Sequence, residues 1–218
     1  MSPMPNVEVN GATILVLKVM KGLVAEEAKV AQAFDEFRPE AVGLSISKEE
    51  LQALKDKTLY DQYELSVLEH FYSVYMQTFG EVRLPTPAYV KVLDLGAERE
   101  IPVLPLDMND KEFTEKYCEL IGARAMVREA FYTRSVHRKK FNITSPEAFA
   151  ADWDRRLNKA KGFRTLERAR EEHMASSLLN LSKKHRRILA IVEFERSAGV
   201  EALLKRSMSS APPGMKGA

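Results

Sequence analysis

Short apolar runs alternate along the chain with longer segments in which apolar residues recur at helical spacing. Residues 12–19 form an almost continuous run of aliphatic and β-branched side chains, which is typical of a strand buried on both faces. The same character predicts strands at residues 41–46 and 187–194 and a short edge strand at 7–9. Residues 101–106 form another apolar run. Its two prolines cannot donate hydrogen bonds to a sheet, so we expect this strand to be irregular or to lie at an edge.

The segments between these strands carry the signals of helices. Residues 22–37 place their large apolar side chains, Leu23 among them, on one face of a helix. Ser47 and Asn109 are each followed three residues later by a glutamate, a pattern that predicts capped helix starts. Because strand, helix and strand follow in this order, we expect right-handed connections between parallel strands. The sequence therefore predicts an α/β fold, with a small, mostly parallel sheet of four to five strands flanked by helices and a long helical C-terminal region.

Most of the chain is expected to form one domain. We predict a single α/β domain over residues 1–208, with helical insertions at 60–80 and 122–184, followed by a disordered tail at 209–218. The insertion at 60–80 carries aromatic residues at helical spacing, which indicates a core face or a subunit interface. We therefore expect a homo-oligomer that associates through these aromatic helices or through the long C-terminal helices.

Composition limits the class of protein. The 218 residues are 45% hydrophobic and 29% charged, which is typical of a globular chain. No apolar run in the sequence approaches the roughly 20 residues that a membrane span needs, and the first residues lack the basic and apolar regions of a signal peptide. The single cysteine, Cys118, excludes an intrachain disulfide and is expected to be a small core residue of an amphipathic helix. We expect a cytoplasmic protein without a membrane span.

Charge is divided unevenly along the chain. Residues 1–121 hold 12 basic and 21 acidic residues, whereas residues 122–218 hold 21 and 10. Such asymmetry is typical of contact between oppositely charged faces or of an acidic partner. Basic clusters at 134–140, 155–170 and 183–187 leave open a nucleic-acid-binding protein, although no recognition motif accompanies them. Solvated helix faces explain the same clusters.

Polar side chains stand where each predicted strand ends. In an open parallel sheet, ligands bind outside the carboxyl ends of the strands. The candidate ligand-binding residues at these ends are Lys18, Ser45, Asp107, Glu193, Glu195 and Arg196. Strand ends are polar in any fold of this class, so a network of internal salt bridges explains the same residues. Both interpretations stay open.

Standard catalytic signatures are missing from the sequence. It contains no glycine-rich phosphate loop and no nucleophile elbow. No metal-ligand spacing connects its four histidines, which are His70, His137, His173 and His185. We therefore assign no metal ligand and no bound cofactor. Glu193 and Glu195 could still begin a carboxylate site for a divalent metal if the last strand continues past them.

The order of several segments resembles the TraB family, which is related to the Tiki, GumN and EreA/ChaN-like proteins. Residues 14–38 look like the family's first strand and helix, and residues 101–107 look like its strand that ends in aspartate. Residues 170–175 are similar to its E-R-D-x-Y-M-A helix, with Ala169 in place of the glutamate. Residues 188–200 look like the strand that leads to its G-x-G-H-x-x-G-I motif. The resemblance covers most of the chain, although no single segment is specific.

The resemblance also implies that the family's functional residues are missing. It implies a proposed metal-dependent hydrolytic site made of histidines after the first strand and at the last strand, with a glutamate after the second strand. Met20, Ser45 and Arg196 stand at those positions. A guanidinium would also repel a metal ion. We therefore expect a non-catalytic or functionally diverged TraB-like protein, in effect a pseudoenzyme.

The basic residues suggest what such a site would hold instead. A guanidinium binds a carboxylate or phosphate in a bidentate fork. An anionic small molecule near Arg170, Arg196 and Lys18 is therefore the ligand we expect. The first alternative is a hydrolase, metal-dependent or not, with a re-made site that uses the strand-end carboxylates. The second alternative is the nucleic-acid-binding protein that would use the basic helical region.

Overall fold

The computed structural model describes residues 6–62 and 64–209, and their centre is a five-stranded sheet with the strand order β1-β2-β5-β3-β4. The strands are β1 (Asn6–Val9), β2 (Ala12–Val19), β3 (Ala41–Leu44), β4 (Val103–Pro105) and β5 (Arg187–Glu193). β1 is antiparallel to β2, and the pairs β2–β5, β5–β3 and β3–β4 are parallel. The α/β fold and the mostly parallel sheet are thus confirmed, and the proline-containing strand lies at an edge, as expected.

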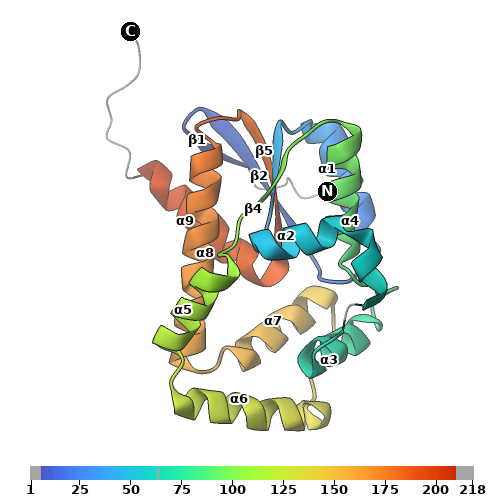
Figure 1. Cartoon of the computed structure of the whole chain (residues 1–218), viewed down its shortest axis with the longest axis vertical. Helices are drawn as coiled ribbons and strands as arrows, with labels where there is room; N and C mark the ends of the chain where they lie inside the picture. The colour runs from blue at the N-terminus through green and yellow to red at the C-terminus, as the bar shows by residue number, and fades with distance from the viewer. Residues whose placement is uncertain (1–5, 63, 210–218) are drawn as a thin grey trace.

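Helices surround this sheet (Figure 1). In chain order they are α1 (Glu26–Phe37), α2 (Lys48–Lys55), α3 (Val67–Met76), α4 (Pro87–Glu98), α5 (Asp110–Leu120), α6 (Ala123–Ser135), α7 (Pro146–Leu157), α8 (Lys161–Leu181) and α9 (Phe194–Ser209), with short 3₁₀ helices at Lys57–Gln62 and Val136–Arg138. The side chains of Ser47 and Asn109 cap α2 and α5 as the sequence predicts. None of the helices in the described part of the chain has the length and apolar character that crossing a bilayer requires.

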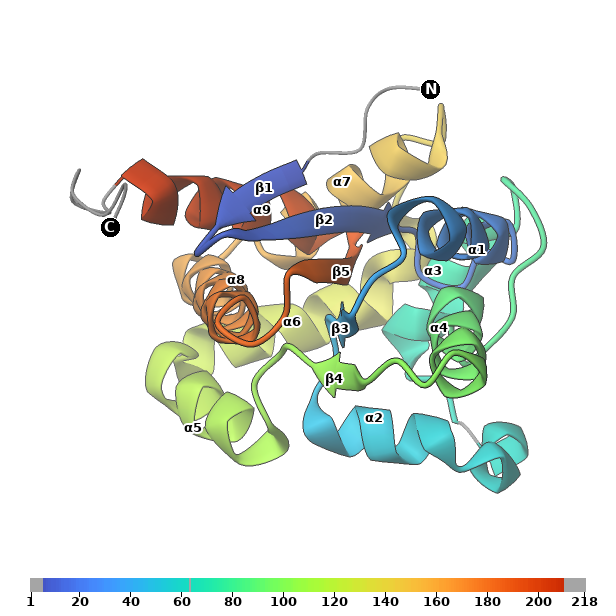
Figure 2. The same cartoon turned by 90° about the horizontal axis from the view of Figure 1, so that it is seen from above.

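The two faces of the sheet are covered by different helices (Figure 2). Leu15 and Leu17 of β2 point toward α1 and α4 and share a buried cluster with Phe34. Ile14 and Val16 point the other way, where they pack with α8 and α9. This alternation follows from the pleat of a strand, which sends successive side chains to opposite faces. Because both faces are covered, nearly all of β2 is buried, and this explains its continuous apolar run.

The inserted helices α3, α6 and α7 lie beyond the carboxyl ends of the parallel strands, in the lower part of Figure 1. Aromatic rings join α3 to α7: Tyr72 and Tyr75 both contact Phe149, with ring centroids 5.3 Å apart in each pair. Phe149 also packs against Trp153 at 5.7 Å. These aromatic side chains therefore form a core of their own, the aromatic cluster. The homo-oligomer stays a prediction.

Several predicted boundaries and burials were wrong. Helix α1 begins at Glu26, because Leu23 instead pairs with Val82 in an isolated antiparallel bridge. The predicted aromatic helix is shorter than 60–80: Tyr60 lies in a 3₁₀ helix, and Tyr63 lies outside the described residues. Cys118 is exposed, because α5 turns its other face, with Phe113 and Tyr117, inward.

The C-terminal boundaries also differ from the prediction. The break before α8 falls at residues 158–160. Strand β5 ends at Glu193 and passes into α9 without a loop, so Phe194, which was predicted to end the strand, begins this helix. Of the predicted tail, Ser209 belongs to α9 and residues 210–218 lie outside the described residues.

The aromatic cluster provides a test of the fold. Phe149→Ala should lower the free energy of unfolding by about 3–5 kcal/mol, because it leaves a large cavity among rings that cannot close over it. Phe131→Ala is the matched control, since Phe131 lies on α6 and is 65% exposed. Urea denaturation of both variants checks this expectation. Equal, small losses would show that the rings of α3 and α7 are not packed as described.

Candidate ligand-binding site

A cavity of about 520 Å³ lies beyond the carboxyl ends of β2 and β5. We call it the strand-end cavity. Its floor includes Glu193 at the end of β5 and Arg170 on α8. Helices α3, α5, α6, α7 and α8 supply its walls. The aromatic residues among them are Tyr72, Phe113, Tyr117, Trp153 and Phe163. The cavity thus occupies the position at which open α/β sheets bind ligands, and the inserted helices enclose it.

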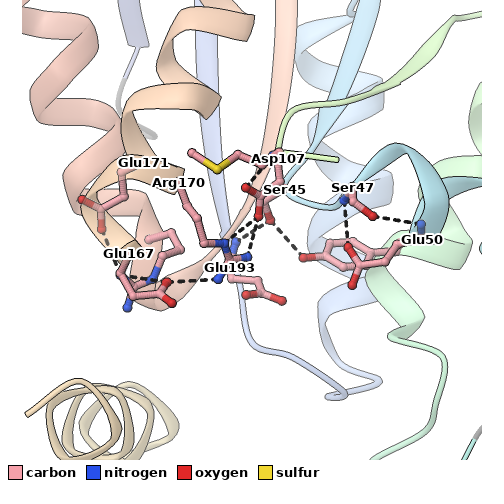
Figure 3. Close-up of polar contacts among 11 residues, drawn as sticks. Ser45, Ser47, Glu50, Asp107, Glu167, Arg170, Glu171 and Glu193 are labelled. Atoms are coloured by element: carbon pink, nitrogen blue, oxygen red, sulfur yellow. Dashed lines mark hydrogen bonds and ion pairs between the residues drawn. The ribbon is translucent and has the colours of Figure 1, made fainter. Parts of the chain in front are cut away.

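Arg170 lies deep on the sheet side of this cavity and is paired with carboxylates (Figure 3). Its Nε donates to Asp107 Oδ2 at 2.9 Å, and its Nη1 donates to Glu167 at 3.0 Å. Burial by itself would lower the pKa of Arg170, but Glu167 and Asp107 outweigh that effect and raise it. The guanidinium is therefore permanently charged and is held between β4 and α8.

Arg196 forms a second, similar cluster. This buried guanidinium lies in the first turn of α9 and contacts Asp154 of α7. It also donates to Glu171 at 3.1 Å and lies 3.4 Å from Glu167. Three carboxylates thus surround one guanidinium, and Glu167 lies between both arginines. The sequence alone did not identify Asp154, Glu167 and Glu171, because nothing in their spacing distinguishes them from solvated helix residues.

Ser45 supports the backbone of the site. Its Oγ lies 3.0 Å from the Tyr89 hydroxyl, and it accepts a hydrogen bond from the backbone N–H of Glu193 at 3.1 Å. Both side chains are buried. Ser45 is therefore a positioning residue that joins β3 to the end of β5, and it does not line the strand-end cavity.

Lys18 lies apart from the other candidates. It is on the same face of β2 as Ile14 and Val16, which pack toward α9. There its Nζ lies 3.0 Å from Glu201 of α9. Lys18 comes before the strand end, and the pleat directs it away from the cavity. The structure therefore brings together Arg170, Arg196 and the carboxylates, but not Lys18.

Glu193 and Glu195 line the strand-end cavity together. Glu195 Oε1 accepts a hydrogen bond from the Tyr72 hydroxyl at 3.2 Å, whereas its Oε2 is buried and has no hydrogen-bond partner among the described residues. Burial, with the negative charge of Glu193, raises the pKa of Glu195 to about 7, although Arg196 opposes the shift. A carboxylic acid that is protonated near neutral pH is thus present in this cavity, and Tyr72, whose own pKa is raised by burial, stays a donor to it.

Negative charge is in excess in the strand-end cavity. Six acidic and three basic residues of the described chain line it: Glu69, Glu129, Asp154, Glu167, Glu193 and Glu195, with Lys21, Arg170 and Arg196. The two arginines are surrounded by carboxylates, and Lys21 lies 3.7 Å from Glu69. No group of three or more His, Cys, Asp or Glu side chains in the described residues is arranged to hold a metal ion. The cavity therefore favours a ligand with hydrogen-bond donors or a positive charge.

No protein-family model matches this chain, and no curated protein matches it. The resemblance to the TraB family therefore rests on the quoted residues and stays a prediction. Its three key positions do lie at or near the strand ends. Met20 packs into the aromatic cluster, Ser45 bonds Tyr89, and Arg196 is surrounded by carboxylates.

The raised pKa of Glu195 predicts how stability depends on pH. Its ordinary value is 4.5, so between pH 4.5 and 7 the unfolded chain has released a proton that the folded chain keeps. The contribution of Glu195 to stability is therefore lost as pH rises through this window and is constant above it. Glu195→Gln cannot ionise, so relative to the parent it should gain up to about 3 kcal/mol between pH 4.5 and 8.

Urea denaturation of the parent and Glu195→Gln at pH 4.5, 6 and 8 measures this difference. Glu193, Asp154, Arg196 and Tyr72 face Glu195, and the comparison keeps all four. Glu98→Gln removes an exposed carboxylate of α4 and serves as the control, for which a flat difference is expected. A flat difference for Glu195→Gln as well would mean that Glu195 is ionised throughout.

Proposed function

We propose that this protein binds a small molecule in the strand-end cavity and is a diverged, TraB-like member without the family's metal chemistry. The observation that carries the proposal is the cavity itself. It stands at the carboxyl ends of parallel strands, has aromatic walls, and holds ionisable groups on its floor. Small-molecule sites typically combine apolar walls with a few polar groups in this way.

The residues at the family's catalytic positions support the non-catalytic part of the proposal. Met20 offers only a thioether and is buried among aromatic rings. The Ser45 hydroxyl already accepts from the backbone of Glu193. The guanidinium of Arg196 is cationic and would repel a metal ion. None of the three offers the charged oxygen or imidazole nitrogen that a hydrolytic metal site needs.

An anionic ligand, which the arginines suggested from the sequence, is not favoured by their pairing. Arg170 and Arg196 already bind Asp107, Glu167, Asp154 and Glu171. An anion would have to displace these carboxylates, which are attached to the protein and therefore compete at high local concentration. Its own charge would add to a cavity that already holds an excess of negative charge.

A metal-free acid–base enzyme is the second candidate, and Glu195 is the observation that favours it. A carboxylic acid with a pKa near 7 can both give and take a proton at neutral pH. If this candidate is right, any hydrolytic activity should persist in EDTA and fall at least about 100-fold in Glu195→Gln. Assays of ester, phosphoester and peptide substrates with both proteins test it, and activity that EDTA removes would exclude it.

Nucleic-acid binding has less support. Arg155 and Arg156 both pair with Asp152, Arg168 pairs with Glu172, and Arg187 pairs with Glu40. These arginines of the basic clusters are therefore balanced by neighbouring carboxylates and do not contribute to a free basic face. Phosphate binding needs such a face.

The small-molecule proposal is tested by closing the cavity. Ser73 of α3 lines it, whereas the next residue, Val74, is 45% exposed and does not. A compound from a panel of amines, alcohols, carboxylates and phosphates should raise the melting temperature of the parent. Ser73→Phe should lower the affinity for that compound at least tenfold, because the phenylalanine ring occupies the space that the compound needs.

Val74→Phe places the same ring on the same helix outside the cavity, and the parent affinity is expected for it. Binding that both variants keep, or that both lose, would contradict a site in the strand-end cavity. The melting temperature of each variant without compound shows that it folds. A panel in which no compound stabilises the parent would also count against the proposal.

A further inference from the structure

The carboxylate of Glu193 is one of the acidic groups that line the strand-end cavity. Its backbone is fixed, because its N–H donates to Ser45 Oγ at 3.1 Å. Its side chain, in contrast, forms no hydrogen bond or salt bridge with another side chain of the described residues. Among the nearby cations, Arg170 attracts Glu193 through its charge but donates its hydrogen bonds to Asp107 and Glu167. Arg196 is held by other carboxylates, and Lys21 lies beside Glu69.

Glu193 also stands where two cavities meet. Besides the strand-end cavity, it lines a smaller one of about 160 Å³ against α2 and α4. The two cavities share Glu193, Lys21 and Leu84, and the smaller one includes Tyr60 and Tyr89. A ligand with one group bound at Glu193 can therefore place its remaining atoms in either cavity, along apolar and aromatic side chains.

The neighbouring groups leave Glu193 as the charged partner. Glu195 lies on the same floor, and its carboxyl is protonated over much of the range below neutral pH. Asp154 and Glu167 face the arginines. Glu129 also lines the cavity, but it accepts a hydrogen bond from the Tyr117 hydroxyl at 3.4 Å. Glu193 is thus the lining carboxylate that no side chain of the described residues contacts through a hydrogen bond or salt bridge.

The walls favour an organic cation over a metal ion. No metal-binding group of three His, Cys, Asp or Glu side chains occurs in the described residues. Aromatic faces attract cations. Phe113 of the cavity wall already has such a contact, since the Arg170 guanidinium lies 5.9 Å from the centre of its ring. Tyr72 and Trp153 line the same cavity.

We propose that the strand-end cavity binds an organic amine, with its ammonium group on the Glu193 carboxylate and its apolar body against Tyr72 and Trp153. This inference rests on the proposed small-molecule function and specifies its ligand class. An ammonium supplies the hydrogen-bond donors and the charge that Glu193 lacks, and the aromatic walls bury the remainder of the molecule.

Three probes of similar shape test the charge. They are phenethylamine, 2-phenylethanol and 3-phenylpropionate, which are a cation, a neutral molecule and an anion at pH 6, where the Glu195 carboxyl is mostly protonated. Trp153 is the single tryptophan of the sequence and lines the cavity, so its fluorescence reports occupancy directly. Phenethylamine should change this fluorescence saturably, with an affinity at least tenfold above that of the other two probes.

Glu193→Gln should lower the affinity for phenethylamine at least tenfold and leave the affinity for 2-phenylethanol unchanged, because the substitution removes the charge of the side chain and keeps its shape. Glu98→Gln makes the same change of net charge on exposed α4 and should bind like the parent. Thermal unfolding of each variant shows that it is folded, and Ser73→Phe should abolish the fluorescence change.

The outcomes separate this inference from the proposed function. Two results would overturn the preference for an amine: tighter binding of 3-phenylpropionate, or equal binding of all three probes. If Ser73→Phe weakens that binding, the proposal of a small-molecule site in the cavity is kept. Phenethylamine binding that survives Glu193→Gln would likewise overturn the role of Glu193. If none of the probes binds, the amine is overturned, and the broader compound panel decides the proposed function by itself.

Discussion

Two arginines with their shared carboxylates hold together parts of the molecule that are distant in sequence. Arg170 connects α8 to the end of β4 through Asp107, and Arg196 connects α9 to α7 and α8 through Asp154 and Glu171. Glu167 reaches both arginines. Removing one partner from a buried pair typically costs about 3–5 kcal/mol, because a charge is left uncompensated. The relative positions of these four elements, and thus the shape of the strand-end cavity, depend on this network.

The close approach of α8 and α9 gives this network its geometry. A Cβ at Gly199, one turn after Arg196, would meet the carboxylate of Glu171, so a larger residue there would displace this side chain from its position beside Arg196. The network also decides the chemistry of the cavity. Arginines that hold protein carboxylates so closely are poorly placed to receive a ligand. In the proposed site, recognition of the ligand is therefore assigned to Glu193 and Glu195, which line the cavity and form no salt bridge with another described side chain.

Much of the fold could be predicted from the sequence because its signals are local. A buried parallel strand needs a continuous apolar run, and a capped helix needs its cap, so the strands and the starts of α2 and α5 are readable one segment at a time. The predictions that failed depend on tertiary contacts. Leu23, which was predicted to be helical, instead forms a bridge with Val82, and Lys18 lies on the face of the sheet toward α9. The acidic partners of the arginines come from helices whose position over the sheet no local pattern specifies.

Some features of the site also follow from the local sequence, whereas others depend on tertiary contacts. Strand ends are identifiable from sequence, so Ser45, Asp107 and Glu193 were found, and the parallel sheet necessarily gathers them at one edge. The sign of the charge that a ligand must carry depends instead on pairing. From the sequence, arginines near strand ends favour an anion. In the folded protein each arginine pairs with two or more carboxylates, so the net charge around the cavity is negative and a cation is favoured instead. Charges along a chain therefore indicate where a cavity with polar residues lies better than they indicate the charge of the ligand proposed for it, because only the fold determines which charges cancel.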